Sequence, residues 1–205
     1  MLCALKQRKE IATAIDVFDV HQGAADGPTF KAVQAILGHA KNVSTLVLRL
    51  SFRRFRVFPV VDVFAFLVTL DSNIPHATIA PFLLRHPHVE NLTLGLCGNS
   101  RRCPLSLCPL PSLQWLTCPL GCVRALTSGK PVTWLAATND DVEHIPFPFL
   151  NVFDFRPLGT SAILTTLHID FDETSAQLLH RVSTAAPALQ NLKLTESKFS
   201  QEVRS

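Results

Sequence analysis

The sequence contains no tyrosine and a single methionine, and only 17% of its 205 residues are charged. Lysine and arginine outnumber aspartate and glutamate by 19 to 16, a formal charge of +3, which is too small to indicate an overtly basic nucleic-acid binder. With 47% hydrophobic residues, the chain also lacks the polar composition of a disordered protein. A chain of this length buries roughly 70% of its unfolded surface, so we predict a globular protein.

No hydrophobic run is long enough to cross a bilayer. The most apolar stretch, residues 57–70, is interrupted by Pro59 and Asp62, whereas a transmembrane helix needs roughly 20 apolar residues. Residues 1–5 are followed at once by charged residues, so we expect no secretory signal peptide. We therefore expect a cytoplasmic or nuclear protein whose six cysteines are thiols.

A six-residue pattern recurs along the chain: an aliphatic residue, two others, leucine, one other, and an aliphatic or small residue. The clearest copies begin at Val43, Val89, Leu113, Val132, Leu164 and Leu189, and weaker copies begin at Leu67 and Leu150. Successive copies start 14 to 25 residues apart, and most steps are close to the 20–29 residues of a leucine-rich repeat. The shortest step, from Leu150 to Leu164, leaves the register between residues 139 and 165 open.

This pattern predicts an α/β fold, a leucine-rich-repeat solenoid over residues 29–199 with a parallel inner sheet and a mixed helical and irregular outer side. Residues 1–28 are an N-terminal segment and candidate cap, and residues 200–205 are a tail. Amphipathic stretches capped by Thr29, Thr78 and Thr174 predict outer helices. The proline-rich residues 103–111 are predicted to be extended or turn segments.

Several segments resemble a known family. They are Pro81–Val89, Cys118–Val123, Phe153–Pro157 and Leu167–Asp172. Together they resemble the leucine-rich-repeat region of fungal F-box-like proteins, over about residues 29–197. The resemblance implies a substrate-recognition role in a cullin-type ubiquitin ligase. Residues 1–40 contain no F-box, so a cullin-type scaffold is expected as a partner only of a longer form that carries one. The alternative is a stand-alone binding or inhibitor protein.

The residues between the aliphatic positions are predicted to line the exposed, concave face of the sheet, because side chains alternate along a strand. Trp115 and Trp134 occupy the same position of adjacent copies, so their rings are predicted to lie side by side. Tryptophan is frequent at binding hot spots, so the pair is a candidate anchor for a partner protein. The alternative, that one or both pack under a loop as core, stays open. The predicted polar surround is Asn91, Thr93, Thr117, Thr166, His168, Asp170, Asn191 and Lys193.

No metal or other cofactor is expected. The cysteines between residues 97 and 122 include no C-x-x-C pair, and their gaps match no compact zinc knuckle. Cys97 is interpreted as a residue that bonds loop amides at the ninth repeat position, and Cys118 as a core residue.

No catalytic residues are expected either. His168, Asp170 and Asp172 alternate in a predicted strand, yet no motif ties a nucleophile to them, so we interpret them as polar surface and loop-bonding residues. His86 and His88 flank a proline, which favours a turn over a ligand pair. The chain is therefore not expected to be an enzyme.

Arginines form local basic patches next to Phe52 and Phe55. They are Arg49, Arg53, Arg54 and Arg56, with Arg101 and Arg102 further along the chain. A nucleic-acid surface is one interpretation, but the small net charge favours a solvated rim.

Overall fold

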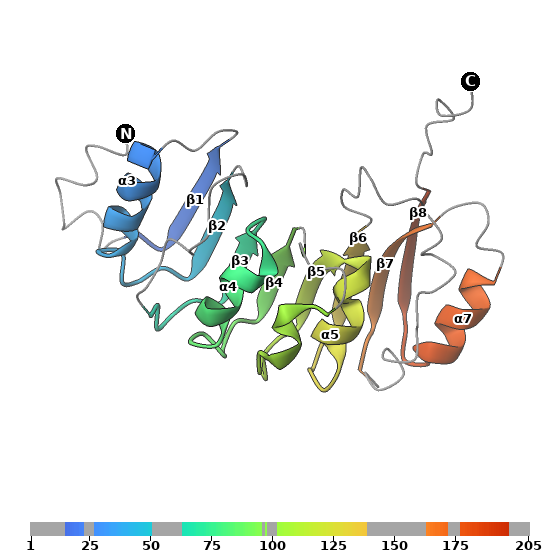
Figure 1. Cartoon of the computed structure of the whole chain (residues 1–205). Helices are drawn as coiled ribbons and strands as arrows, with labels where there is room; N and C mark the ends of the chain where they lie inside the picture. Colours follow the sequence, from blue (N-terminus) through green and yellow to red (C-terminus); the bar gives the residue numbers. More distant parts are fainter. Residues whose placement is uncertain are drawn as a thin grey trace, which may run out of the picture. The chain divides into compact units, whose positions relative to one another are not determined.

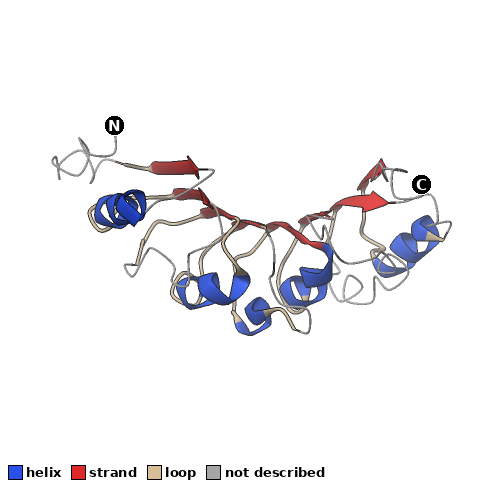
Figure 2. Ribbon diagram, turned by 45° about the horizontal axis from the view of Figure 1, so that its top comes forward, coloured by secondary structure: helices blue, strands red, loops and turns tan. Residues whose placement is uncertain are grey.

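The computed structural model describes residues 15–22, 27–50, 63–95, 97, 102–138, 163–171 and 177–196. The chain divides into two compact units, residues 1–113 and residues 114–205. Each unit is an α/β assembly of four described parallel strands, and in each the helices lie on one side of the strands (Figures 1 and 2).

The described part of the first unit contains four strands in chain order, each paired with the next in parallel. Its elements are β1 (Val17–Gln22), α3 (Gly27–Leu37), β2 (Thr45–Leu50), β3 (Thr69–Ser72), α4 (His76–Leu83), β4 (Asn91–Leu94) and the 3₁₀ turn η2 (Pro104–Leu107). Thr45 pairs with Val17 on one side and with Thr69 on the other, and Thr69 pairs with Asn91.

The second unit repeats this arrangement. Its elements are β5 (Trp115–Pro119), the 3₁₀ turn η3 (Leu120–Cys122), α5 (Val123–Thr127), β6 (Trp134–Thr138), β7 (Thr166–Phe171), α7 (Leu178–Ala185) and β8 (Asn191–Glu196). Trp115 pairs with Trp134, Trp134 with Thr166, and Thr166 with Asn191. Equivalent positions of successive copies therefore share one row of the sheet.

The recurring pattern predicted these strands. Each strand from β2 to β8 begins two residues after the start of a predicted copy, so the expected α/β class and the parallel pairing within each unit are confirmed. The weaker copy at Leu150 lies outside the described residues, and β6 pairs directly with β7.

Burial follows the same pattern. The first, fourth and sixth positions of the copy at Val132 are Val132, Leu135 and Ala137, and all three are buried. They face the helix side, while the residues between them face the opposite side of the sheet. Each fully buried aliphatic side chain contributes about 1.5–3 kcal/mol, so this alternation fixes which face each strand presents.

The predicted helix starts were wrong where they can be checked. The helix α3 begins at Gly27, before Thr29, and takes Pro28 into its first turn, where proline's missing N–H costs nothing. The helix α4 begins at His76 after Pro75, with no side-chain cap from Thr78. Thr174 lies outside the described residues, and α7 begins at Leu178.

Four of the described elements were not predicted, among them the 3₁₀ turn η3. The strand β1 lies in the N-terminal segment, where Phe18 is buried and Val17 is exposed. The short helix α5 follows β5, and the proline-rich residues 103–111 include the 3₁₀ turn η2.

Among the described residues, no helix combines the length and hydrophobicity that a membrane span needs.

Candidate functional site: the aromatic row of the second unit

The two tryptophans stack on the sheet face opposite the helices. Their ring centroids are 5.2 Å apart and their planes differ by 17°. Trp115 and Trp134 are a register pair on adjacent parallel strands, which lie about 4.8 Å apart, so the strand spacing itself sets the stacking distance. The predicted side-by-side placement is confirmed.

His168 extends the stack onto a third strand. Its ring meets Trp134 edge to face, with centroids 5.0 Å apart and an interplanar angle of 67°. His168 pairs in register with Ala136, two residues beyond Trp134. Because alanine has only a methyl group, it leaves the space through which the imidazole leans toward the indole. We call Trp115, Trp134 and His168 the aromatic row.

The aromatic row is a surface feature. Trp115 is 52% exposed and Trp134 is half-buried, whereas Leu116 and Leu135, their immediate neighbours along the strands, are fully buried. The alternative that the tryptophans pack as core is therefore wrong. An indole that is half exposed is a surface on which another flat or aliphatic group can pack.

Polar side chains surround the aromatic row on the same unit. Thr117 and Lys193 lie in the register row of His168, and Thr166 and Asn191 lie in the register row of the tryptophans. Asp170 lies two residues beyond His168 along β7, opposite Thr195. Asn191 and Lys193 are exposed, and Thr117, Thr166 and Asp170 are half-buried.

Two predicted surround residues, Asn91 and Thr93, belong to the first unit. Both are half-buried on β4, and the Asn91 Nδ2 donates a hydrogen bond to Thr69 Oγ1 at 3.0 Å. Among the predicted site residues, the structure thus brings together those of the second unit and places these two on the other unit.

The predicted basic patch is described only in part. Arg49 lies on β2 and forms a two-pronged ion pair with Asp71 on β3, with Nη2 to Oδ2 at 2.7 Å and Nε to Oδ1 at 3.2 Å. Arg102 is exposed. Arg53, Arg54, Arg56 and Arg101 lie outside the described residues, as does Asp172.

The segment at His86 is a turn, as predicted, and it buries one histidine. The Phe64 backbone N–H donates to His86 Nε2 at 2.9 Å, so Nε2 carries no proton and Nδ1–H donates to the Phe82 carbonyl at 2.8 Å. The ring stacks on Phe82 with centroids 4.0 Å apart. Burial is the largest influence on this imidazole and lowers the pKa of His86 below its usual value, against the opposing effect of the Phe82 carbonyl.

Two other features of the described residues bring potential binding groups together. A hollow between α7 and β8 is lined by Leu179, Val182, Leu189 and Leu192 and includes His180. Its mainly apolar lining gives it no catalytic arrangement.

The second feature is a cluster of His76, Cys97 and Cys103 in the first unit. Sequence reasoning missed this cluster because His76 is distant in sequence from the cysteines. Cys118 is buried in the core of its strand, as predicted.

No protein-family model matches the chain, and no curated protein matches its sequence, so its function is inferred from its own residues.

Proposed function

We propose that the chain is a protein-recognition module of the leucine-rich-repeat type, and that the aromatic row of the second unit anchors a partner protein. The observation that carries this proposal is the stacked tryptophan pair, whose outer member is 52% exposed. Covering that exposed half of an indole removes on the order of 130 Å² from water, worth about 3 kcal/mol. That is the size of a binding hot spot.

Three further features support a binding surface. The tryptophans are held by paired strands, so they lose little conformational freedom when a partner binds. Thr117, His168 and Lys193 offer hydrogen-bonding groups around the apolar rings, which is the arrangement of an interface core with a polar rim. The repeated pattern supports the leucine-rich-repeat interpretation, since each copy contributes one strand to such a surface.

The partner that fits is a protein segment that places a flat or aliphatic side chain, such as proline, leucine or arginine, against the exposed face of Trp115. Proline and leucine would gain from burial, and a guanidinium would gain from the electron-rich indole face. Polar backbone groups of the same segment would bond to Thr117 and Lys193.

The test is a peptide selection with matched variants. A displayed peptide library is enriched on the immobilised full chain, and the enriched peptides are then titrated against Trp115→Ala, Trp134→Ala and Leu107→Ala by fluorescence anisotropy. Leu107 is the control because it is also an exposed apolar residue, 76% accessible, but lies in the first unit. We expect Trp115→Ala to weaken binding by about 30-fold or more and Leu107→Ala to leave it unchanged. Equal binding by all variants would contradict the proposal.

The specific form of this function that the resemblance suggests is substrate recognition for a cullin-type ubiquitin ligase, with a stand-alone binding or inhibitor protein as the alternative. The two differ in one observable. A ligase receptor co-purifies with a cullin scaffold when the endogenous protein is isolated, and that association survives Trp115→Ala because it does not use the aromatic row. Isolation without the scaffold favours the stand-alone protein.

A further inference from the structure

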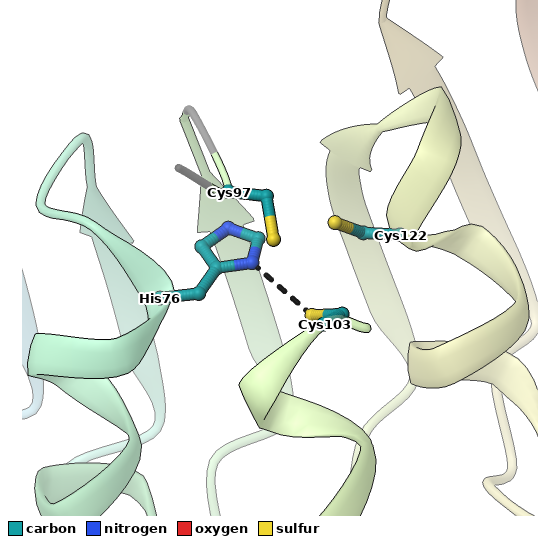
Figure 3. Close-up of side chains that lie close together, drawn as sticks. All are labelled: His76, Cys97, Cys103 and Cys122. Atoms are coloured by element: carbon teal, nitrogen blue, oxygen red, sulfur yellow. Dashed lines mark hydrogen bonds between the residues drawn. The ribbon is translucent and has the colours of Figure 1, made fainter. Parts of the chain in front are cut away.

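Three side chains of the first unit converge although they are scattered along the sequence. His76 is the first residue of α4, Cys97 follows β4, and Cys103 immediately precedes η2. Their ligand atoms, one ring nitrogen and two sulfurs, all lie within 4.8 Å of one another, and Figure 3 shows the side chains directed toward a common point. We propose that these three residues form a zinc site.

The spacing of the ligand atoms fits a tetrahedral zinc ion. With Zn–N of about 2.0 Å and Zn–S of about 2.3 Å, the nitrogen and sulfur ligands of one ion lie about 3.5 Å apart. His76 Nδ1 and Cys103 Sγ are 3.3 Å apart, close to that value. Cys97 Sγ needs only a small side-chain movement to join them, because the 4.8 Å limit is about 1 Å above the sulfur–sulfur separation of a tetrahedral site.

The imidazole of His76 has the orientation of a metal-binding histidine. Its Nε2 lies 3.1 Å from the Gly95 carbonyl oxygen, and a ring that donates Nε2–H to this carbonyl keeps the Nδ1 lone pair for the cluster. Metal-binding histidines are positioned in this way, with the second ring nitrogen hydrogen-bonded to a carbonyl or carboxylate.

Gly95 is itself held in place by the neighbouring strand. Its N–H donates to the Ser72 carbonyl at 2.9 Å, and a Cβ at this position would lie 2.9 Å from Asn73 Cα. Only glycine therefore allows the close approach that aims the carbonyl at His76. The carbonyl that orients His76 is thus positioned by the ends of β3 and β4.

Burial provides the low-dielectric setting that a thiolate–zinc site uses. His76 and Cys103 are buried and Cys97 is half-buried, so an ion held by them would be largely removed from solvent. Binding of Zn²⁺ replaces the protons of the two thiols, which are released to solvent. The ion would then be held by two thiolates and one neutral imidazole, with a water molecule in the fourth position. Cys122, also drawn in Figure 3, belongs to the second unit, and the proposed site uses only the three side chains of the first.

Such a site joins three segments that lack a shared strand or helix: the start of α4, the segment after β4 and the start of η2. The proposal is independent of the aromatic row, which lies on the second unit. It assigns a metal site to the first unit and adds to the recognition function.

The experiment uses the full chain, purified under reducing conditions and freed of metal with a chelator. Cobalt(II) is titrated in as a spectroscopic probe, and Zn²⁺ is then added as competitor. We expect one equivalent of cobalt to bind with thiolate charge-transfer bands and intense visible d–d bands, and zinc to abolish both. Circular dichroism checks that each variant remains folded.

The variants are Cys97→Ser, Cys103→Ser and the control Cys108→Ser. Cys108 is a buried thiol of the same unit that donates to the Ala80 carbonyl and is not part of the cluster. We expect each ligand variant to lose more than the roughly 10–100-fold in metal affinity that removal of an outer-shell partner costs, and Cys108→Ser to bind like the wild type. A wild-type chain that binds no cobalt, or ligand variants that bind it as tightly as Cys108→Ser, would overturn the proposal.

Discussion

The two units have the same strand geometry but present different chemistry on equivalent positions. In the first unit the row begins with the exposed Val17 and continues with the small polar residues Thr45, Thr69 and Asn91, and Asn91 bonds to Thr69. In the second unit the equivalent row begins with Trp115 and Trp134. The buried positions of the strands are mainly aliphatic in both units, so the scaffold leaves the exposed positions free to differ.

The sides of the sheets that the helices cover also differ. There it is the first unit that carries the distinctive polar side chains. The first unit buries two histidines, His76 and His86, each hydrogen-bonded through both ring nitrogens. Among the residues described in the second unit, the buried side chains are apolar apart from Thr127. The first unit therefore concentrates its specific chemistry inside, and the second unit displays it on the surface. The predictions below test this contrast.

The largest expected effect separates two neighbours on β5. Leu116 is fully buried, so Leu116→Ala should lower the free energy of unfolding by about 2–5 kcal/mol. Trp115→Ala removes a larger but exposed side chain and should cost less than about 1.5 kcal/mol, from lost stacking. Urea denaturation measures both. If Trp115→Ala proved as destabilising as Leu116→Ala, the indole would be part of the core and the contrast would fail.

A glycine in each unit provides the second comparison. Gly95→Ala places a Cβ against the Asn73 backbone and should destabilise the first unit by about 1–3 kcal/mol. A Cβ at Gly121, in the second unit, meets nothing within 4 Å, so Gly121→Ala should be neutral or slightly stabilising. Thermal unfolding distinguishes these outcomes, and equal midpoints for the two variants would show that the close approach at Gly95 is not required.

Burial of His86 should make the stability of the first unit depend on pH. Because the pKa of His86 is lowered in the folded chain, the unfolded chain binds its proton first as pH falls below 6.5. The contribution of His86 to the free energy of unfolding is therefore fully present above pH 6.5. It declines below pH 6.5, until the imidazole of the folded chain is also protonated. His86→Gln should be less stable above pH 6.5 by about 1–3 kcal/mol and should show a shallower decline. Denaturation curves at a series of pH values measure this slope. An unchanged slope in His86→Gln would assign the decline to other groups.

The smallest expected effect concerns the ion pair between Arg49 and Asp71. Both side chains are partly exposed, so a double-mutant cycle with alanine at each position should give a coupling of about 0.2–1 kcal/mol that weakens with added salt. Urea denaturation of the four proteins supplies the cycle. A coupling above this range that persisted at high salt would mean that the exposed face of the first unit is also a specific, ordered site.

The regular part of the fold could be read from the sequence because the repeat places aliphatic residues at fixed positions. Strand β1 was missed although residues 15–20 carry the same pattern, with Phe18 where leucine stands in other copies. Helix starts were misplaced because threonine caps were expected at Thr29 and Thr78, while the helices begin two residues earlier, at Gly27 and His76. Helix ends are the part of an element that local sequence fixes least well.

The two candidate sites differed in how far the sequence could predict them. The tryptophan pair follows from the repeat register, so its stacking was predictable. The edge-on contact of His168 was not, because it depends on the small side chain of Ala136 beside it. The cluster of His76, Cys97 and Cys103 was invisible to motif spacing, because its ligands come from separate segments that only folding brings together.

The most direct test of the account is acrylamide quenching of Trp115 alone. The chain has two tryptophans, so Trp134→Phe leaves Trp115 as the sole indole emitter and retains an aromatic stacking partner. We expect red-shifted, readily quenched emission in the free protein, and strong protection once a peptide selected on the wild-type chain is bound. Blue-shifted emission that is already shielded in the free protein, or quenching that the bound peptide does not change, would contradict the claim that this indole anchors a partner.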